Sequence, residues 1–298
     1  MSRYRFIAAA AARRPVALSC RVLGVSRAGY YAWRGRPPAA RARADAALTA
    51  AIHRIHTKSR GTYGSPRVHA ELAQLDQRCG RKRVARLMRA AGLVGCQRRR
   101  RRPRTTVTDP AATPAPDLVR RRFTAPAPDR VWLADISYIP TGEGWLYLAA
   151  VLDAFSRRVV GWAMADHLRT ELVLDALNLA LWRRRPAPGL IHHTDRGCQY
   201  TSLAFGRRLR DAGLVPSMSR PANCWDNAAA ESFFATLKRE LVDRPDRAPW
   251  PTRAAARTAI FEYIEAWYNR ERRHSALAYL SPAAYEAAHG ASTPATVA

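Results

Sequence analysis

Residues 132–165 read WLADISYIPTGEGWLYLAAVLDAFSRRVVGWAMA, and this stretch sets the fold class. It contains three apolar runs, 132–139, 146–153 and 158–165, that are rich in β-branched and aromatic residues. Turn residues separate the runs, and closely spaced runs of this kind are typical of consecutive antiparallel strands. The stretch therefore predicts a three-stranded β meander.

Helical and strand patterns alternate after this meander. Apolar residues in 170–184 recur at helical spacing, which predicts an amphipathic helix packed on the sheet. Shorter apolar runs and further helical patterns follow it along the chain. The expected elements are strands at 189–194 and 215–219 and helices at 203–212, 227–242 and 255–269. Together they predict an α/β domain with a mixed five-stranded sheet.

The first hundred residues have a helical pattern. Short helices are expected within 1–36 and at 45–55, and a pair of helices is expected to begin near Pro66 and at Arg81. The second helix of the pair carries the basic residues Arg81, Lys82, Arg83 and Arg86. This helix-turn-helix-like pair predicts a DNA-binding region. An ordinary helical hairpin with a solvated charged face fits the same pattern.

Positive charge is concentrated in the N-terminal part of the chain. The 298 residues include 50 Lys and Arg against 23 Asp and Glu, a formal net charge of +27. Residues 1–129 hold 29 of the basic residues and 6 of the acids, a net charge of +23, whereas residues 130–298 carry a net charge of +4. The expected partner is a polyanion, with nucleic acid first.

A basic, proline-rich linker is expected between the helical part and the α/β part. Its cationic run, which is expected to neutralise phosphates, consists of Arg98, Arg99, Arg100, Arg101 and Arg102. The predicted division is an N-terminal helical segment at 1–44, a helix-turn-helix-like DNA-binding region at 45–97, the linker at 98–128, a core with C-terminal helices at 129–285 and a tail at 286–298.

Composition excludes several classes of protein. A chain with 48% hydrophobic and 24% charged residues can bury a core, which excludes wholesale disorder. Five cysteines without a CxxC pair argue against a disulfide framework and against a zinc ribbon. The apolar run at 144–151 is too short to cross a membrane. We therefore expect a cytoplasmic protein without a membrane partner.

Three carboxylates occupy positions that suggest chemistry. Asp135 lies inside the first predicted strand, where an unpartnered charge is costly. Asp195 ends the fourth strand, at the edge where open sheets bind ligands, and Glu231 lies near the start of the long helix at 227–242. A strand interior, a strand end and a helix start can converge at one edge of a sheet. Three carboxylates that converge there repel one another unless divalent cations neutralise them.

Some neighbouring polar residues have structural interpretations. Asp153 is expected to pair with Arg157 or Arg158 rather than with a metal. Asp226 and Asn227 are expected to cap the helix that carries the glutamate. In both interpretations these residues stabilise the structure around a site and are not part of it.

Other polar residues leave two interpretations open. His192 and His193 point to opposite faces of a strand, which disfavours a shared zinc ion, although one of them could position DNA or a metal-bound water. A basic cluster beyond the last long helix, which could contact phosphate or could be a solvated turn, consists of Arg270, Arg272, Arg273 and His274.

Eight blocks of sequence, spread over nearly the whole chain, resemble one known family. They are Tyr30-Tyr-Ala-Trp33, Thr62-Tyr-Gly64, Arg83-Val-Ala-Arg-Leu-Met88, Trp132-Leu-Ala-Asp135, Leu152-Asp-Ala-Phe-Ser-Arg157, His192-His-Thr-Asp-Arg-Gly197, Asp226-Asn227 with Glu231-Ser232, and Tyr268-Asn269 with Arg273-His274-Ser275. Thirty-five residues separate Asp195 from Glu231, and Lys238 follows Glu231 by seven. The set resembles the OrfB-type transposases of the IS-three group of bacterial insertion sequences; a single block would be a weak signal.

This resemblance implies a ribonuclease H-like core, similar to retroviral integrase, that cleaves DNA strands and transfers them. It implies that Asp135, Asp195 and Glu231 are the metal-binding catalytic triad and that Lys238 contacts the DNA end. Oxygen ligands of this kind suit Mg²⁺ and admit Mn²⁺. Two ions about 4 Å apart would clamp the attacking and leaving oxygens of an in-line displacement at phosphorus.

The resemblance also implies partners. Double-stranded DNA is expected, both as element ends and as target, with the protein acting as a homo-oligomer on the bacterial nucleoid. Active enzymes of this family are commonly frameshift fusions with an upstream OrfA portion, whose leucine-zipper heptads are not found in this sequence, so an OrfA partner is expected. Two alternatives stay open: a nuclease of the same fold that lacks strand transfer, and a DNA-binding remnant that lacks catalysis.

Overall fold

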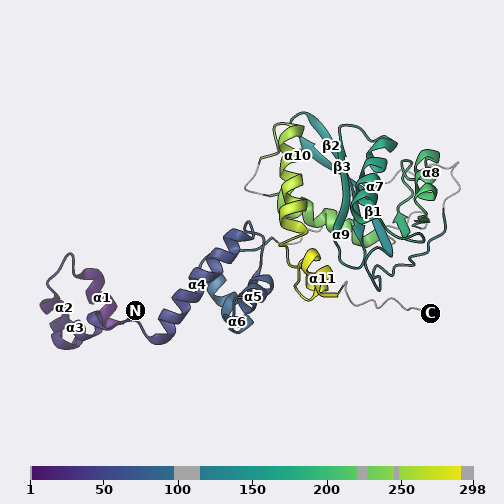
Figure 1. Ribbon diagram of the computed structural model, residues 1–298. Coiled ribbons are helices and arrows are strands. Elements are labelled where there is room, and N and C mark those ends of the chain that lie inside the picture. Colours follow the sequence, from purple (N-terminus) through teal and green to yellow (C-terminus); the bar gives the residue numbers. More distant parts are fainter. Residues whose placement is uncertain (1, 97–114, 220–226, 245–247, 290–298) are drawn as a thin grey trace, which may run out of the picture.

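The computed structural model describes residues 2–96, 115–219, 227–244 and 248–289 (Figure 1). A series of helices leads into a sheet that is covered by further helices. The predicted cationic run at 98–102 lies outside the described residues, as does the rest of the predicted linker up to residue 114.

The sheet has five strands in the order β3-β2-β1-β4-β5. The strands are β1 (Val131–Thr141), β2 (Gly144–Asp153), β3 (Val159–Ala165), β4 (Ile191–Thr194) and β5 (Val215–Met218). The first three pair antiparallel, β4 pairs parallel to β1, and β5 pairs parallel to β4. The predicted meander and the predicted mixed five-stranded sheet are therefore confirmed.

Helices cover both faces of the sheet. One face packs against α7 (Thr170–Arg184) and α8 (Leu203–Asp211), and the other packs against α9 (Ala228–Leu237) and α10 (Arg253–Glu262). Neighbouring side chains on β2 enter different clusters because the side chains of a strand alternate between faces. Ala149 and Val151 belong to the first face, and Leu148, Ala150 and Leu152 belong to the second.

Both long helices of the second face change their winding before they end. α9 continues as the π-helix η2 (Lys238–Val242), and α10 continues as the π-helix η3 (Tyr263–Tyr268). The long helices predicted at 227–242 and 255–269 are confirmed, and the structure adds the change from α to π winding, which periodicity over one turn does not reveal. The chain then forms η4 (Ser275–Leu277) and α11 (Pro282–His289).

In the residues that the structure describes ahead of the sheet, there are six helices. They are α1 (Arg3–Ala10), α2 (Val16–Val22), α3 (Arg27–Gly35), α4 (Ala40–Lys58), α5 (Ser65–Gln74) and α6 (Arg81–Ala90). The first three form a small cluster of their own around Ile7, Cys20 and Tyr30, and Figure 1 shows them at the far end of α4 from the sheet. In the described residues, no helix is both long enough and apolar enough to cross a membrane.

Two of the predicted domain boundaries fall inside helices. α4 runs through residue 44, and α11 runs through residue 285. The hydrophobic core of α4, α5 and α6 is also continuous with the core between the sheet, α9 and α10. The division of the chain into domains stays a prediction.

The start of α5 contacts the segment that follows η3 through hydrogen bonds. The Tyr63 hydroxyl accepts a hydrogen bond from the Arg273 amide at 2.7 Å, and Arg67 Nε donates to the Arg273 carbonyl at 2.9 Å. The Arg273 guanidinium in turn bonds to the Glu71 carboxylate, with Nε 2.7 Å from Oε1. These contacts join residues that are about two hundred positions apart in the sequence.

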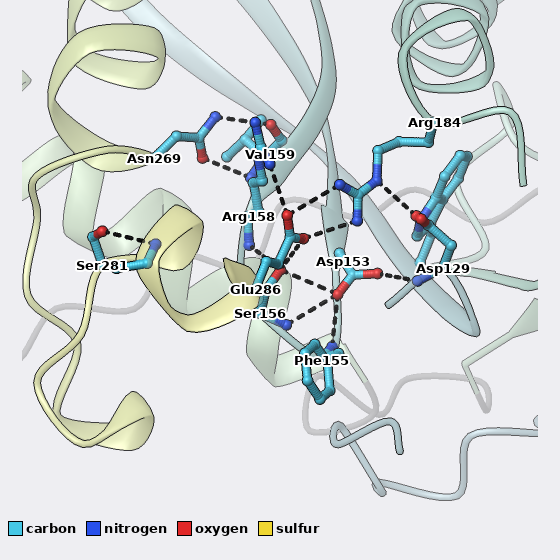
Figure 2. A network of polar contacts seen from close by, with 12 residues as sticks. Asp129, Asp153, Phe155, Ser156, Arg158, Val159, Arg184, Asn269, Ser281 and Glu286 are labelled. Carbon is cyan, nitrogen blue, oxygen red and sulfur yellow. Dashed lines mark hydrogen bonds and ion pairs between the residues drawn. The ribbon is translucent and has the colours of Figure 1, made fainter. Parts of the chain in front are cut away.

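A polar network fixes α7 and the start of β1 against α11 (Figure 2). Arg184 Nε donates to Asp129 at 2.9 Å, and its Nη2 donates to Glu286 at 2.8 Å. Arg158 Nη1 donates to the second Glu286 oxygen at 2.7 Å. Residue 286 was predicted to begin a tail, but its carboxylate lies at the centre of this network.

Asp153 is fully buried at the end of β2 beside this network. Its oxygens accept hydrogen bonds from the backbone amides of Asp129 at 2.7 Å, Phe155 at 2.9 Å and Ser156 at 3.0 Å. The predicted structural role is confirmed, whereas the predicted pairing with an arginine is wrong because backbone amides occupy the carboxylate. Burial outweighs these hydrogen bonds and raises the pKa of Asp153 to about 6.

We expect Gly161→Ala to destabilise the fold, because β3 and α7 approach too closely at this position for a side chain. An added Cβ would lie 2.2 Å from the Ala176 carbonyl oxygen and 2.7 Å from the Ala180 Cβ. The free energy of unfolding should fall by about 1–3 kcal/mol in chemical denaturation. Gly206→Ala in α8 is the control, since its Cβ has no contact shorter than 3.8 Å and should stabilise the helix. Equal stability of the two variants would contradict this packing.

We expect Asp153 to make the fold less stable as the pH rises from about 4 to about 6. The unfolded chain releases this proton near its ordinary pKa of 3.8, whereas the folded chain holds it up to about 6, so the free energy of unfolding falls across this window. The total change is up to about 3 kcal/mol. Denaturation series on the wild type and on Asp153→Asn should differ by this pH-dependent component. Parallel pH profiles would show that Asp153 is ionised throughout.

Candidate active site

Asp135 lies in the middle of β1, half-buried, level with the end of β4. Its Oδ1 accepts a hydrogen bond from the Ile136 amide at 2.7 Å. Burial, and then the nearby charges of Asp195 and Glu231, raise the pKa of Asp135 well above its ordinary value. The predicted site carboxylates therefore lie within electrostatic reach of one another.

Asp195 follows β4 directly, at the carboxyl end of that strand. Its Oδ1 accepts a hydrogen bond from the Gly197 amide at 3.0 Å, which forms a tight turn around the carboxylate. A Cβ at Gly197 would lie 3.1 Å from the same oxygen. Gly197 thus leaves a space beside the Asp195 carboxylate, and the side chain of a larger residue would reduce that space.

Glu231 lies in the first turn of α9 and is exposed. Lys238 lies seven residues further, where α9 passes into η2, and is half-buried. Burial lowers the pKa of Lys238, while the charges of Asp243 and Asp135 oppose this change. Among the predicted DNA-contacting residues that the structure describes, Lys238 is the one whose charge acts on Asp135.

Asn227 corrects a sequence prediction. It occupies the N-cap position of α9, but its side chain makes no capping hydrogen bond. Instead, Nδ2 donates to the Ala134 carbonyl at 3.1 Å, so the start of α9 is held against β1 next to Asp135. The side chain positions the helix relative to the strand, which a local pattern could not reveal. Asp226, the other predicted cap, lies outside the described residues.

The donor set of the site consists of carboxylate oxygens, which suits a hard divalent cation. Their mutual repulsion, seen in the raised pKa of Asp135, is what a cation would neutralise. Across the described ranges, no three His, Cys, Asp or Glu side chains are arranged to hold one metal ion together. The charges of Asp195 and Glu231 thus act on Asp135, but the three carboxylates are not arranged around one common point.

Tyr200 is a neighbour of the site that the sequence pattern did not single out. Its ring is buried against Phe205, and its hydroxyl has no hydrogen-bond partner among the described residues. Burial, and then the charges of Asp135 and Asp195, raise its pKa well above the ordinary value. The sequence signal was an aromatic residue five positions after Asp195, and many core aromatics give the same signal.

The two adjacent histidines of β4 have separate surroundings. His192 is buried at 5.5 Å from the Phe205 ring, and burial lowers its pKa to about 3, so it is neutral. The Nδ1 atom of His193 lies 2.8 Å from the Ser217 hydroxyl on β5. The geometry places both rings in the packing of the sheet.

The predicted DNA-binding helix is α6. Arg81 and Lys82 are exposed at its start. Arg83 Nε and Arg86 Nη2 each donate to Asp45 of α4 at 2.7 Å, and these hydrogen bonds lower the pKa of Asp45. The sequence pattern treated the four basic residues as one set, but the structure divides them into an exposed pair and a pair bound to Asp45.

The segments of the chain match known family models. Residues 125–224 and residues 212–282 each match a model described as an integrase core domain. Residues 42–102 match a model described as an HTH-like domain. The mixed sheet of this chain lies within the first of these segments and is thus the ribonuclease H-like sheet of an integrase core.

Relatives match over most of their length. The uncharacterized 31 kDa protein of insertion element IS600 from Shigella sonnei is 42% identical over 89% of this chain and 96% of its own. The transposase of insertion sequence IS904 from Lactococcus lactis is 42% identical over 80% and 93%. Transposase InsF of insertion sequence IS3A from Escherichia coli is 38% identical over 95% and 98%. The chain therefore belongs to the family of insertion-sequence transposases with an integrase core domain.

Proposed function

We propose that this chain is the catalytic subunit of a DNA transposase that cleaves and joins DNA strands at the ends of an insertion element. The observation that carries the proposal is the placement of Asp135 on β1 level with Asp195 at the end of β4, where Asn227 holds the helix of Glu231 against β1. The chain's similarity to transposases of bacterial insertion sequences supports it. The DNA is double-stranded, as element ends and as target, within the bacterial nucleoid.

Asp135, Asp195 and Glu231 would hold two Mg²⁺ ions, or Mn²⁺ in their place. Bound there, the ions supply Lewis-acid stabilisation of charge at the attacking and leaving oxygens. Asn227 keeps the helix of Glu231 against the strand of Asp135, which fixes the spacing of the carboxylates. The charge of Asp135 acts on Lys238, and the Lys238 ammonium would bind a phosphate that enters the same site.

The remaining parts of the chain would bind and organise DNA. Arg81 and Lys82 on α6 face solvent and are available to phosphates, and the cationic run at 98–102 would add to this contact. The regions 1–44, 45–97, 98–128, 129–285 and 286–298 would serve as helical segment, DNA-binding region, linker, catalytic core and tail. The active assembly would be a homo-oligomer on DNA, with an OrfA partner.

We expect Glu231→Gln to abolish strand joining, because the amide removes one anionic metal ligand and leaves the shape of the side chain unchanged. Labelled element-end DNA is incubated with Mg²⁺, and cleaved and joined products are separated on a denaturing gel. Product formation should fall at least about 100-fold. The chain is measured alone and fused to its upstream-frame partner, so that a need for the partner becomes visible.

The control is Glu171→Gln, which removes one exposed carboxylate in the first turn of α7. It should leave joining unchanged. Cleavage without joining in the wild type would instead indicate a nuclease. Binding without cleavage, even in the fused form, would leave a DNA-binding remnant.

We expect the double variant Arg81→Gln with Lys82→Gln to weaken DNA binding in a salt-dependent way. Each lost phosphate contact should lower the slope of log affinity against log salt concentration by about one. Fluorescence anisotropy with a labelled duplex across a NaCl series measures this slope. Arg207→Gln with Arg210→Gln on α8 removes the same charge and serves as the control. Equal slopes in the two double variants would refute the contact.

A further inference from the structure

A cavity of about 220 Å³ lies where α5, the turn between β2 and β3, α9 and the segment after η3 meet. Its lining includes Arg67 of α5, Arg157 of the turn, Arg272 and His274. Ser232 and Thr236, one turn apart on α9, also line it. None of the described residues that line the cavity is acidic. We call this site the arginine cavity.

The positive charge of the arginine cavity exceeds what nearby carboxylates neutralise. Glu240 is committed to Arg272, whose Nη2 and Nε lie 2.6 Å and 2.8 Å from its two oxygens, and to the Tyr263 hydroxyl at 2.9 Å. Arg67 and Arg157 bond instead to backbone carbonyls. In the described part of the chain, neither of these two guanidinium groups bonds to a carboxylate.

His274 adds a neutral donor to the cavity. Its Nε2 lies 3.2 Å from Arg272 Nη1, which can only donate, so Nε2 accepts and the ring proton is on Nδ1. Burial, and then the charges of Arg272, Arg67 and Arg157, lower the pKa of His274 well below its ordinary value. The imidazole remains neutral because the cavity is already too positive to hold another proton.

Side chains of these kinds suit a compact anion. Arginines from separate elements line the cavity together with His274, Ser232 and Thr236, and guanidinium, imidazole and hydroxyl groups are donors that match the oxygens of a phosphate group. The half-buried guanidinium groups of Arg67 and Arg157 have no carboxylate partner in the described residues, so an anion would supply one.

We propose that the arginine cavity binds a phosphate of the DNA backbone, and this inference rests on the proposed function. Its walls come from α5 of the HTH-like region and α9 of the integrase core, and Ser232 on α9 directly follows Glu231. A DNA strand that runs from the HTH-like region onto the core would cross α9, which carries Glu231 on one face and lines the cavity with another. A phosphate bound there contacts both regions at once and aligns them on the same DNA.

The test measures DNA binding without metal, so that catalysis plays no part. The full chain and the variants Arg67→Gln and Arg157→Gln are titrated with a labelled element-end duplex across a NaCl series. Each variant should lose at least about tenfold in affinity and about one in salt slope. Arg207→Gln, an equal loss of charge on the opposite face of the sheet, is the control and should match the wild type. Variants that match this control would overturn the proposal.

A second measurement uses a conservative variant and alters the DNA as well. Duplexes in which single phosphates are replaced one at a time by neutral methylphosphonates are titrated with the wild type and with Arg157→Lys, which keeps the charge but loses the planar fork. One position should weaken wild-type binding and show a smaller effect in the variant. Additive effects at every position would overturn the proposal.

Inorganic phosphate distinguishes the two sources of the ligand. At constant ionic strength, phosphate should raise the melting temperature of the wild type and not that of Arg157→Gln. Stabilisation by phosphate together with additive methylphosphonate effects would overturn the DNA assignment and leave a site for free phosphate. Absence of strand joining by the wild-type chain would instead count against the proposed function. The two failures are distinguishable because binding to the arginine cavity is measured without metal.

Discussion

The ion pair between Glu240 and Arg272 holds together the parts of the molecule that the function needs. Both side chains are 4% exposed, and both carboxylate oxygens are bonded, so the cost of burying two charges is largely offset. Loss of one partner in such a pair costs about 3–5 kcal/mol. The next residue, Arg273, bonds to Glu71 of α5. Two consecutive arginines therefore fix η2 on one side and the helix-turn-helix-like region on the other.

This arrangement explains how like charges can be kept near one another. The carboxylates of Asp135, Asp195 and Glu231 repel, so their own interaction cannot order the site. Packing does this instead, because α9 is held at its start by Asn227 and at its continuation by Glu240. A divalent cation bound there would neutralise carboxylates that packing, and not their own interaction, holds near one another.

The folded structure also decides which basic side chains remain without an acidic partner. The net charge of +27 follows from composition, but whether a given basic residue can bind an anion depends on the carboxylates that lie near it. Asp45 binds Arg83 and Arg86, and Glu240 binds Arg272, so these cations are partly neutralised inside the protein. Arg67 and Arg157 keep their charge without a carboxylate in the described residues. Counting basic residues along the sequence could not make this distinction.

The sequence by itself determined the meander, the five-stranded sheet and the family, because β-prone apolar runs, turn residues and blocks of motif are local properties. Asp135 and Asp195 could be selected for the same reason, since a charge in an apolar strand or at its end is visible in the sequence. Only the tertiary structure decided that Asn227 holds α9 to β1 and that Glu286 is the centre of a network. Such contacts join residues that are ninety or more positions apart, and their free energy depends on burial and geometry that no local pattern records.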